Sequence, residues 1–221
     1  MSRPADRLSA SAPILTGWRS LYRLPAVVLV LGAAAVGAWW IGVVRRQPIQ
    51  RRLARARWVH RITPWITRAV GARVTTRSAI GGAPTGAGMT VSNHISYVDV
   101  FLISAQLPVV FVTSTEMRDT PVLGLLCRLA GCVFVDRQSA RALRAQIQEL
   151  ADLMRDGVHI VVFPEATTSH GHGVLPFKAA LFEAVRLSGR TLWVACVEYP
   201  AAERRISAYV DDDTFASHLT R

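Results

Sequence analysis

The sequence predicts an α/β protein with a mixed, largely parallel sheet flanked by helices, preceded by a transmembrane helix and an interfacial amphipathic segment. From residue 81 onward, short valine-rich runs alternate with helix-like segments, which is typical of strands joined by helices. Twenty uncharged residues lie near the N-terminus, and an arginine-rich run follows them. These features divide the chain into a tail (1–24), a transmembrane helix (25–44), a basic membrane-interface segment (45–80) and a folded domain (81–221).

The uncharged run from Pro25 to Val44 is long enough to cross a hydrocarbon core of about 30 Å. It has no polar stripe, which argues against a core helix, and its length and the Arg45-Arg46 pair after it argue against a cleaved signal peptide. Trp39 and Trp40 lie towards one end, where interfacial aromatics are useful. The arginines after the span predict a single-pass protein of a bacterial-type inner membrane, with its folded domain in the cytoplasm.

Basic residues are concentrated in the first 80 residues, which hold fourteen arginines and one acid. A basic N-terminal segment of this kind can bind nucleic acid or an anionic membrane. The adjacent hydrophobic run favours the lipid bilayer, and not nucleic acid, as the partner. Residues 51–74 place Trp58, Ile62 and Trp65 at helical spacing among arginines. This pattern predicts an amphipathic helix on the bilayer surface, interrupted or bent near Pro64. A solvated helix packed on the folded domain is the alternative.

The folded domain begins with a glycine-rich loop that lacks the Gly-Lys-Ser/Thr ending of a phosphate-binding loop. Its Val-rich runs predict buried strands, and the segments between them predict helices. The expected strands are 89–92, 109–113, 132–135, 159–163, 191–197 and 206–210, and the expected helices are 98–106, 121–129, 140–155 and 177–187.

Polar side chains follow three of these strands, and ligands of α/β sheets bind at the carboxyl ends of strands. His94 and Asp99 follow the first, Asp136 and Arg137 the third, and Glu165 the fourth. With His94 in the turn before a helix and Asp99 in its first turn, the carboxylate reaches one ring nitrogen and leaves the other as a base. The pattern indicates a general-base site.

These residues also resemble the sequence blocks of the glycerolipid acyltransferases, the family typified by lysophosphatidic acid acyltransferase. NHISYVD (93–99) resembles the N-H-x-S-x-x-D block, and FPEATTS (163–169) resembles F-P-E-G-T-R-S. GCVFVDR (131–137) resembles a second block, whose arginine contacts the acceptor phosphate, and LPFK (175–178) resembles the P-F-K that follows the third. The resemblance spans roughly residues 85–215. It implies His94 and Asp99 as catalytic residues and Ser96, Arg137, Glu165, Thr167, Thr168 and Lys178 as substrate-binding residues.

The resemblance implies transfer of a fatty acyl group from acyl-CoA or acyl-carrier protein to the free hydroxyl of a lysolipid, with no cofactor. The main expectation is 1-acyl-glycerol-3-phosphate as acceptor and phosphatidic acid as product. Ala166 replaces the family glycine, a small change if its φ stays negative. Thr168 replaces an arginine that clamps phosphate, so a non-phosphate acceptor such as lyso-ornithine lipid is the alternative.

Two further functions stay open: a non-catalytic membrane lipid-binding protein, and a hydrolase in which His94 activates water. No G-x-S-x-G nucleophile motif is present, so no acyl-enzyme is expected. His170 and His172 lie on a glycine-rich loop without acidic neighbours, and no metal is expected. The three cysteines match no zinc or redox spacing, which predicts buried free thiols in a reducing compartment.

Overall fold

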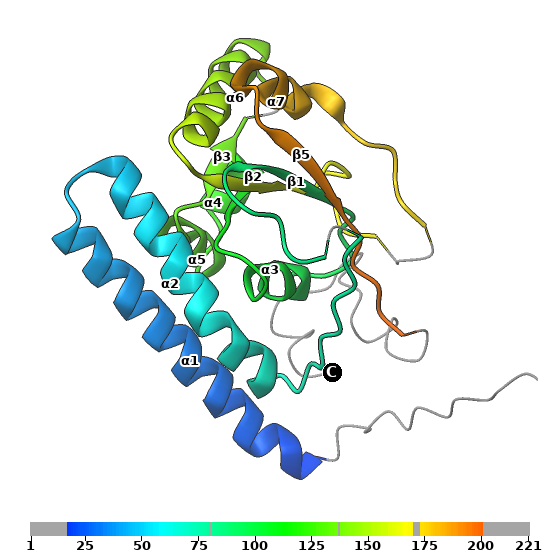
Figure 1. Ribbon diagram of the computed structural model, residues 1–221. Coiled ribbons are helices and arrows are strands. Elements are labelled where there is room, and N and C mark those ends of the chain that lie inside the picture. Colours follow the sequence, from blue (N-terminus) through cyan, green and yellow to red (C-terminus); the bar gives the residue numbers. More distant parts are fainter. Residues whose placement is uncertain (1–16, 80, 137, 170–172, 201–221) are drawn as a thin grey trace, which may run out of the picture.

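The computed structural model describes residues 17–79, 81–136, 138–169 and 173–200. A helical hairpin at the N-terminus is followed by an α/β domain (Figure 1). The helices are α1 (Gly17–Val44), α2 (Pro48–Ala69), α3 (Val98–Ser104), α4 (Thr115–Arg118), α5 (Leu123–Ala130), α6 (Ala140–Arg155), the 3-10 helix η1 (Ala179–Phe182) and α7 (Glu183–Ser188). The strands are β1 (Gly88–Ser92), β2 (Val110–Ser114), β3 (Val133–Val135), β4 (His159–Val162) and β5 (Thr191–Ala195).

The five strands form one sheet in the order β3-β2-β4-β1-β5, and all four pairings are parallel. The predicted α/β class is confirmed, and the described part of the sheet is wholly parallel. Strand β1 lies between β4 and β5, where Val91 pairs with Val162 of β4 and Val194 of β5. Five of the six expected strands are present, and the sixth (206–210) lies outside the described residues.

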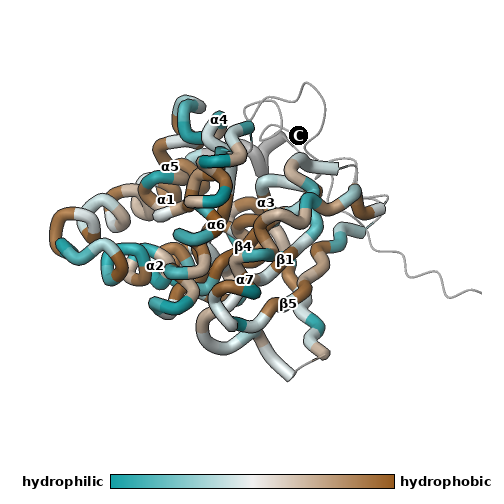
Figure 2. The backbone as a smooth tube through the Cα atoms, turned by 90° about the horizontal axis from the view of Figure 1, so that it is seen from above, coloured by the Kyte–Doolittle hydropathy of each residue, from teal (hydrophilic) through white to brown (hydrophobic). Residues whose placement is uncertain are grey.

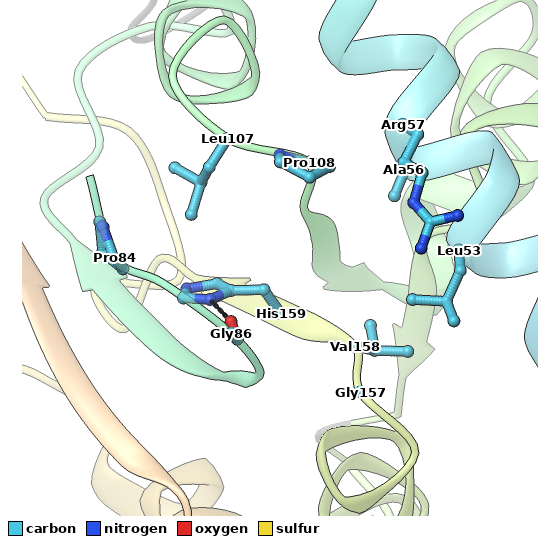
Figure 3. A pocket seen from close by; sticks show the side chains of 10 residues that line it. All are labelled: Leu53, Ala56, Arg57, Pro84, Gly86, Leu107, Pro108, Gly157, Val158 and His159. Carbon is cyan, nitrogen blue, oxygen red and sulfur yellow. Dashed lines mark hydrogen bonds between the residues drawn. The ribbon is translucent and has the colours of Figure 1, made fainter. Parts of the chain in front are cut away.

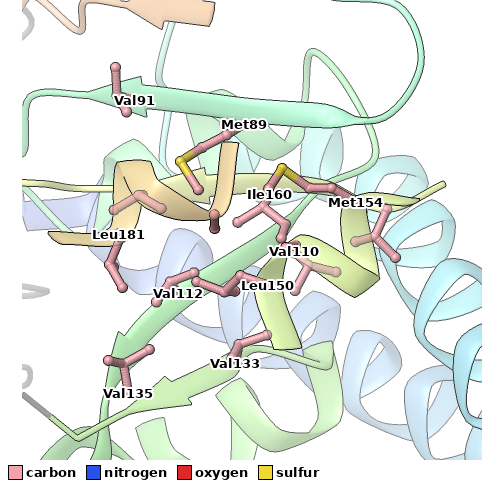
Figure 4. Packing of buried hydrophobic residues seen from close by; sticks show 14 of the residues in the cluster. Met89, Val91, Val110, Val112, Val133, Val135, Leu150, Met154, Ile160 and Leu181 are labelled. Carbon is pink, nitrogen blue, oxygen red and sulfur yellow. The ribbon is translucent and has the colours of Figure 1, made fainter. Parts of the chain in front are cut away.

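Hydrophobic side chains cover both faces of the sheet, as expected for a parallel sheet between helices. Because successive residues of a strand point to opposite faces, each central strand supplies both layers. Val110 and Ile160 pack with α6 and α7, whereas the neighbouring Phe111 and Val161 pack with α3. Figure 4 shows the first layer, in which β1, β2, β3 and β4 meet Leu150 and Met154 of α6.

Helix α6 has the bounds that the sequence predicts, and Ser139 caps it by accepting a hydrogen bond from the Ala142 amide at 3.2 Å. The expected helix at 177–187 is instead divided into η1 and α7. Gly189, with φ of +65°, ends α7 in the left-handed conformation that glycine adopts most easily.

Helices α1 and α2 run antiparallel and side by side (Figure 1). Trp58 Nε1 and Arg55 Nε donate to the carbonyls of Ala34 and Ala38 at 3.0 and 3.1 Å. A Cβ atom at Gly37 would lie 2.3 Å from the Trp58 ring, so only glycine permits this close packing. Of the apolar window in α1, 11% is buried, which excludes a core helix and agrees with membrane anchoring.

Helix α2 continues through Pro64, so the interruption that the sequence allowed there does not occur. A proline removes one helical N–H, but packing of Ile66 and Thr67 against the protein holds the following turn in place. The helix contacts α1, α3 and α5, and hydrophilic residues gather along it in Figure 2. Helix α2 therefore lies between α1 and the folded domain. This position agrees with the second interpretation of residues 51–74, a helix packed on the folded domain.

Candidate active site

The turn between β1 and α3 brings His94 and Asp99 together. His94 lies two residues after the carboxyl end of β1, and Asp99 lies in the first turn of α3. The distance from His94 Nδ1 to Asp99 Oδ2 is 3.0 Å. A carboxylate only accepts hydrogen bonds, so Nδ1 carries the proton and Nε2 is the basic nitrogen. The His94 side chain is 18% exposed, which gives it access to a substrate.

Asp99 is fully buried and surrounded by donors. Its Oδ2 also accepts from the amides of Ile95 and Ser96, at 2.7 and 2.9 Å. Its Oδ1 accepts from the Tyr199 hydroxyl at 2.6 Å. A buried polar group is costly unless it is hydrogen-bonded, and these four hydrogen bonds supply the partners of Asp99.

Tyr199 is a site residue that the sequence analysis missed. It follows β5, the strand beside β1, and so reaches Asp99 across the sheet edge. Burial, together with the negative charge of Asp99, raises the pKa of Tyr199 above its ordinary value, so the hydroxyl stays protonated and donates. Tyr199 follows an expected strand, as His94 and Glu165 do, and this position could have identified it as a site residue.

Glu165 lies after β4, on the other side of β1, and holds the backbone around His94. Its Oε1 accepts from the His94 amide at 2.8 Å, and its Oε2 accepts from the Leu175 amide at 2.9 Å. The Ser169 amide donates to the His94 carbonyl at 2.9 Å. The described hydrogen bonds of Glu165 are with backbone amides, and its exposed fraction is 4%. Its contact with the acceptor stays a prediction.

Two more residues hold the histidine in place. The side chain of Asn93 donates to the Val197 carbonyl at 2.9 Å and accepts from the Val197 amide at 2.8 Å, which joins the β1 turn to the segment after β5. Phe163 stacks on the His94 ring with centroids 3.9 Å apart and an angle of 13°. Phe163 therefore contacts the imidazole directly, whereas Asn93 fixes the backbone turn that carries it; neither was among the predicted site residues.

The structure also describes four of the five other residues that were predicted to bind substrate. Ser96 is fully buried, and its hydroxyl accepts from the Val98 amide at 3.3 Å, as in a helix start. Thr167 and Lys178 are exposed, and Thr168 is half-buried. Arg137 lies outside the described residues, so its role stays a prediction.

Asp136, the described residue of the polar pair after β3, does not lie beside His94. Strands β2 and β4 separate β3 from β1, a distance of roughly 14 Å at about 4.8 Å per strand. Asp136 Oδ1 accepts from the amides of Gln138 and Ser139, at 2.9 and 3.3 Å, just before α6. The structure therefore brings Glu165 to His94 and Asp99 and gives Asp136 a turn-forming role.

Ala166 has φ of +63°, in the left-handed region. The expectation of a small change depended on a negative φ, so the alanine here costs more than expected. A Cβ in this conformation crowds the following carbonyl, with a penalty of about 1 kcal/mol or more. The glycine of the related block fits this backbone without strain.

A cavity of about 170 Å³ lies at the opposite end of the sheet, where His159 begins β4 (Figure 3). Its amino-terminal position separates it from His94 by the length of β1, about 13 Å at 3.3 Å per residue. His159 Nδ1 donates to the Gly86 carbonyl at 3.0 Å, and its Nε2 accepts from the Thr90 hydroxyl at 2.8 Å. Burial lowers the pKa of the His159 imidazole, and the hydrogen bond to Gly86 opposes part of this effect. The lowered pKa favours the neutral imidazole.

Within the described ranges, no three His, Cys, Asp or Glu side chains are grouped to hold a metal. His170 and His172 lie outside those ranges, so the expectation about metal stays a prediction. All three cysteines are free thiols. Cys127 and Cys132 are half-buried, but Cys196 is exposed, which corrects the prediction that all are buried.

Comparison with known proteins gives a consistent result. A family model described as "Acyltransferase" matches residues 58–198. The chain is 36% identical to the lyso-ornithine lipid O-acyltransferase of Rhodobacter capsulatus over 172 residues (74% of this chain, 62% of the relative). It is 30% identical to that of Pseudomonas aeruginosa over 214 residues (92% and 77%). It is 37% identical to the 1-acyl-sn-glycerol-3-phosphate acyltransferase of Neisseria gonorrhoeae over 126 residues (56% and 49%).

The chain thus covers between half and about three quarters of the length of these relatives. Among solved structures, the 1-acyl-sn-glycerophosphate acyltransferase of Thermotoga maritima superposes with a TM-score of 0.58 and 21% identity, over 79% of this chain and 70% of that one. At this identity the likeness concerns the fold, and it agrees with a parallel α/β domain preceded by helices.

Proposed function

This chain belongs to the acyltransferase family, and we propose that it transfers a fatty acyl group from a thioester donor to the free hydroxyl of a lysolipid. The observation that carries the proposal is the contact between His94 Nδ1 and the buried Asp99 carboxylate. It fixes the imidazole tautomer and leaves Nε2 as a base at the carboxyl edge of the sheet. Acyl-CoA and acyl-carrier protein are the proposed donors.

In the proposed reaction, His94 Nε2 removes the proton of the acceptor hydroxyl as its oxygen attacks the thioester carbonyl. Asp99, 3.0 Å away, stabilises the resulting imidazolium. Collapse of the tetrahedral intermediate forms the ester and breaks the carbon–sulfur bond, and His94 returns the proton to the departing thiolate. The amides of residues 94–96 already donate to Glu165 and Asp99, so we assign stabilisation of the oxyanion to other donors.

We propose lyso-ornithine lipid as the acceptor, in place of the 1-acyl-glycerol-3-phosphate first expected. Two observations support this choice. The matches to lyso-ornithine lipid O-acyltransferases extend over 172 and 214 residues, compared with 126 for the glycerol-3-phosphate relative. Thr168 stands where the related block has a phosphate-clamping arginine. Arg137 and Lys178 remain proposed contacts of the acceptor headgroup, and Thr167 and Thr168 proposed hydroxyl contacts.

We propose that α1 attaches the chain to the cytoplasmic membrane face, where lysolipid and soluble donors meet. Val28, Leu29 and Val36 are more than half exposed along α1 and suit hydrocarbon. A helix crossing the whole bilayer would carry the paired α2, with its arginines, into the membrane, at about 2.5–3.5 kcal/mol for each charge at the centre. The pairing therefore favours α1 lying within one leaflet, with α2 on its aqueous side, over the single crossing that the sequence predicted.

The test is a product analysis with a labelled acyl thioester and membranes that contain the wild-type chain. Lyso-ornithine lipid and 1-acyl-glycerol-3-phosphate are supplied separately and in competition. Labelled ornithine lipid at the higher kcat/KM is the expected result. Preferential formation of phosphatidic acid would overturn the acceptor assignment, labelled free fatty acid would indicate a hydrolase, and binding without turnover would indicate a scaffold.

A further inference from the structure

A second cavity lies where the first turns of α2 meet the end of α5 and the outer side of α6. Its volume is about 370 Å³, within the usual range for small-molecule sites. Gly131 and Cys132, which precede β3, also line it. Because β3 is the outer strand and β2 and β4 separate it from β1, this cavity is distinct from the candidate active site.

The cavity is positively charged. Arg51, Arg52 and Arg55 line it from α2, and Arg128 lines it from the last turn of α5. Two carboxylates oppose these four guanidinium groups, Glu149 and Asp156. The 3.5 Å pair between Arg52 and Glu149 is partly exposed, and such a pair contributes little.

The arginines are close enough to repel one another. Burial, and then the positive charges of Arg51 and Arg52, lower the pKa of Arg55. The cluster therefore holds more positive charge than its two carboxylates balance, and an anion bound between the guanidinium groups would relieve the repulsion. The N-terminal end of the 22-residue helix α2 adds its partial positive charge at the same place.

The position of the cavity indicates where the anion comes from. Arg55 Nε donates to the Ala38 carbonyl of α1, so the cavity touches the anchoring helix. The next two residues, Trp39 and Trp40, are 57% and 58% exposed, and tryptophan is enriched at the headgroup level of membranes. When the exposed apolar residues of α1 enter a bilayer, these tryptophans and the cavity lie at the depth of the lipid phosphates.

We propose that this cavity binds the phosphate of an anionic membrane phospholipid, as a site separate from that of the acyl acceptor. Planar guanidinium groups match a phosphate through paired hydrogen bonds, which suits Arg51 and Arg52 to this ligand. Arg55 donates to the carbonyls of Ala38 and Arg128 and contributes its positive charge. The bound lipid fixes the α/β domain relative to the membrane surface beside α1.

The experiment measures lipid binding to the full chain in neutral detergent micelles that carry either phosphatidylglycerol or phosphatidylcholine. Phosphatidylglycerol is expected to raise the midpoint of thermal unfolding, and phosphatidylcholine to leave it unchanged. The double variant Arg51→Gln/Arg52→Gln is expected to bind phosphatidylglycerol about a hundredfold more weakly, since two charge-assisted hydrogen bonds contribute about 1.5 kcal/mol or more each. The micelle holds the chain whichever way α1 enters a bilayer, and no turnover is needed, so the result is independent of the proposed reaction.

The matched control is Arg57→Gln/Arg61→Gln, which removes two exposed charges from the same helix outside this cavity. It is expected to weaken binding less than tenfold, and Glu149→Gln is expected to strengthen it. Equal losses in the two double variants would mean diffuse attraction and would overturn the proposal. Inorganic phosphate that stabilises the wild type as much as phosphatidylglycerol would assign the cavity to free phosphate and overturn the lipid assignment.

Discussion

Replacing Tyr199 with phenylalanine removes one donor from the carboxylate that orients the candidate base. The Tyr199 hydroxyl lies 2.6 Å from Asp99 Oδ1, whereas the other three described donors reach Oδ2. The variant therefore leaves Oδ1 without its described donor in a fully buried position. A hydrogen bond to a charged group contributes about 1.5–3 kcal/mol, which for a chain of this size lowers the unfolding midpoint by about 3–12 °C.

The same change is expected to affect the reaction. With one donor removed, Asp99 is held less firmly and orients His94 less well, so kcat/KM should fall, by less than about tenfold. A tyrosine that only fills space would lower stability without lowering kcat/KM.

The assay is kcat/KM for labelled acyl transfer at neutral pH, with thermal unfolding of the same preparations. Tyr22→Phe, a change at a tyrosine of α1 that is 52% exposed, is the control and should alter both quantities less than Tyr199→Phe does. In an Asp99→Asn background, Tyr199→Phe should cost at least about 1 kcal/mol less than in the wild type, because the charged acceptor is gone. A Tyr199→Phe protein with the wild-type unfolding midpoint and the wild-type kcat/KM would refute the reasoning.

Three further predictions concern single residues. Ala166→Gly should raise the free energy of unfolding by about 0.5–1 kcal/mol in urea titrations, because it relieves a φ of +63°; a loss of stability would contradict this. Glu165→Gln leaves one of two backbone amides without a hydrogen-bond partner, so kcat should fall with the KM for the lysolipid nearly unchanged. A rise in that KM alone would instead support a contact between Glu165 and the headgroup. Folding lowers the pKa of His159 from its ordinary value of 6.5. Its contribution to the free energy of unfolding is therefore complete above pH 6.5 and is lost as the pH falls below 6.5. The unfolding free energy should drop over that range less steeply in His159→Asn, and equal slopes would contradict the assignment.

Elements with strong local signals were predictable from the sequence. The bounds of α6 follow from the Ser139 cap and the apolar spacing that buries Leu150 and Met154. The pairing of His94 with Asp99 followed from a turn and a helix start that are close in sequence. The parallel sheet followed from buried valine runs separated by helices.

Long-range contacts were not predictable in the same way. Tyr199 meets Asp99 only because β5 lies beside β1, and strand order is not encoded in local spacing. Strand order also explains why Asp136, at the far edge, is away from His94. The left-handed backbone at Ala166 arises from the turn after β4, which a single alanine does not reveal. The pairing of α2 with α1 depends on Gly37, whose role is visible only when Trp58 lies against it.

The most direct measurement is the initial rate of acyl transfer from a labelled thioester to lyso-ornithine lipid by wild-type protein and by His94→Ala, at matched protein amounts and unfolding midpoints. If Nε2 of His94 is the base, the variant loses at least about a hundredfold in rate, the lower end of what a general base contributes. A folded His94→Ala protein that retains a rate within tenfold of the wild type would contradict the account.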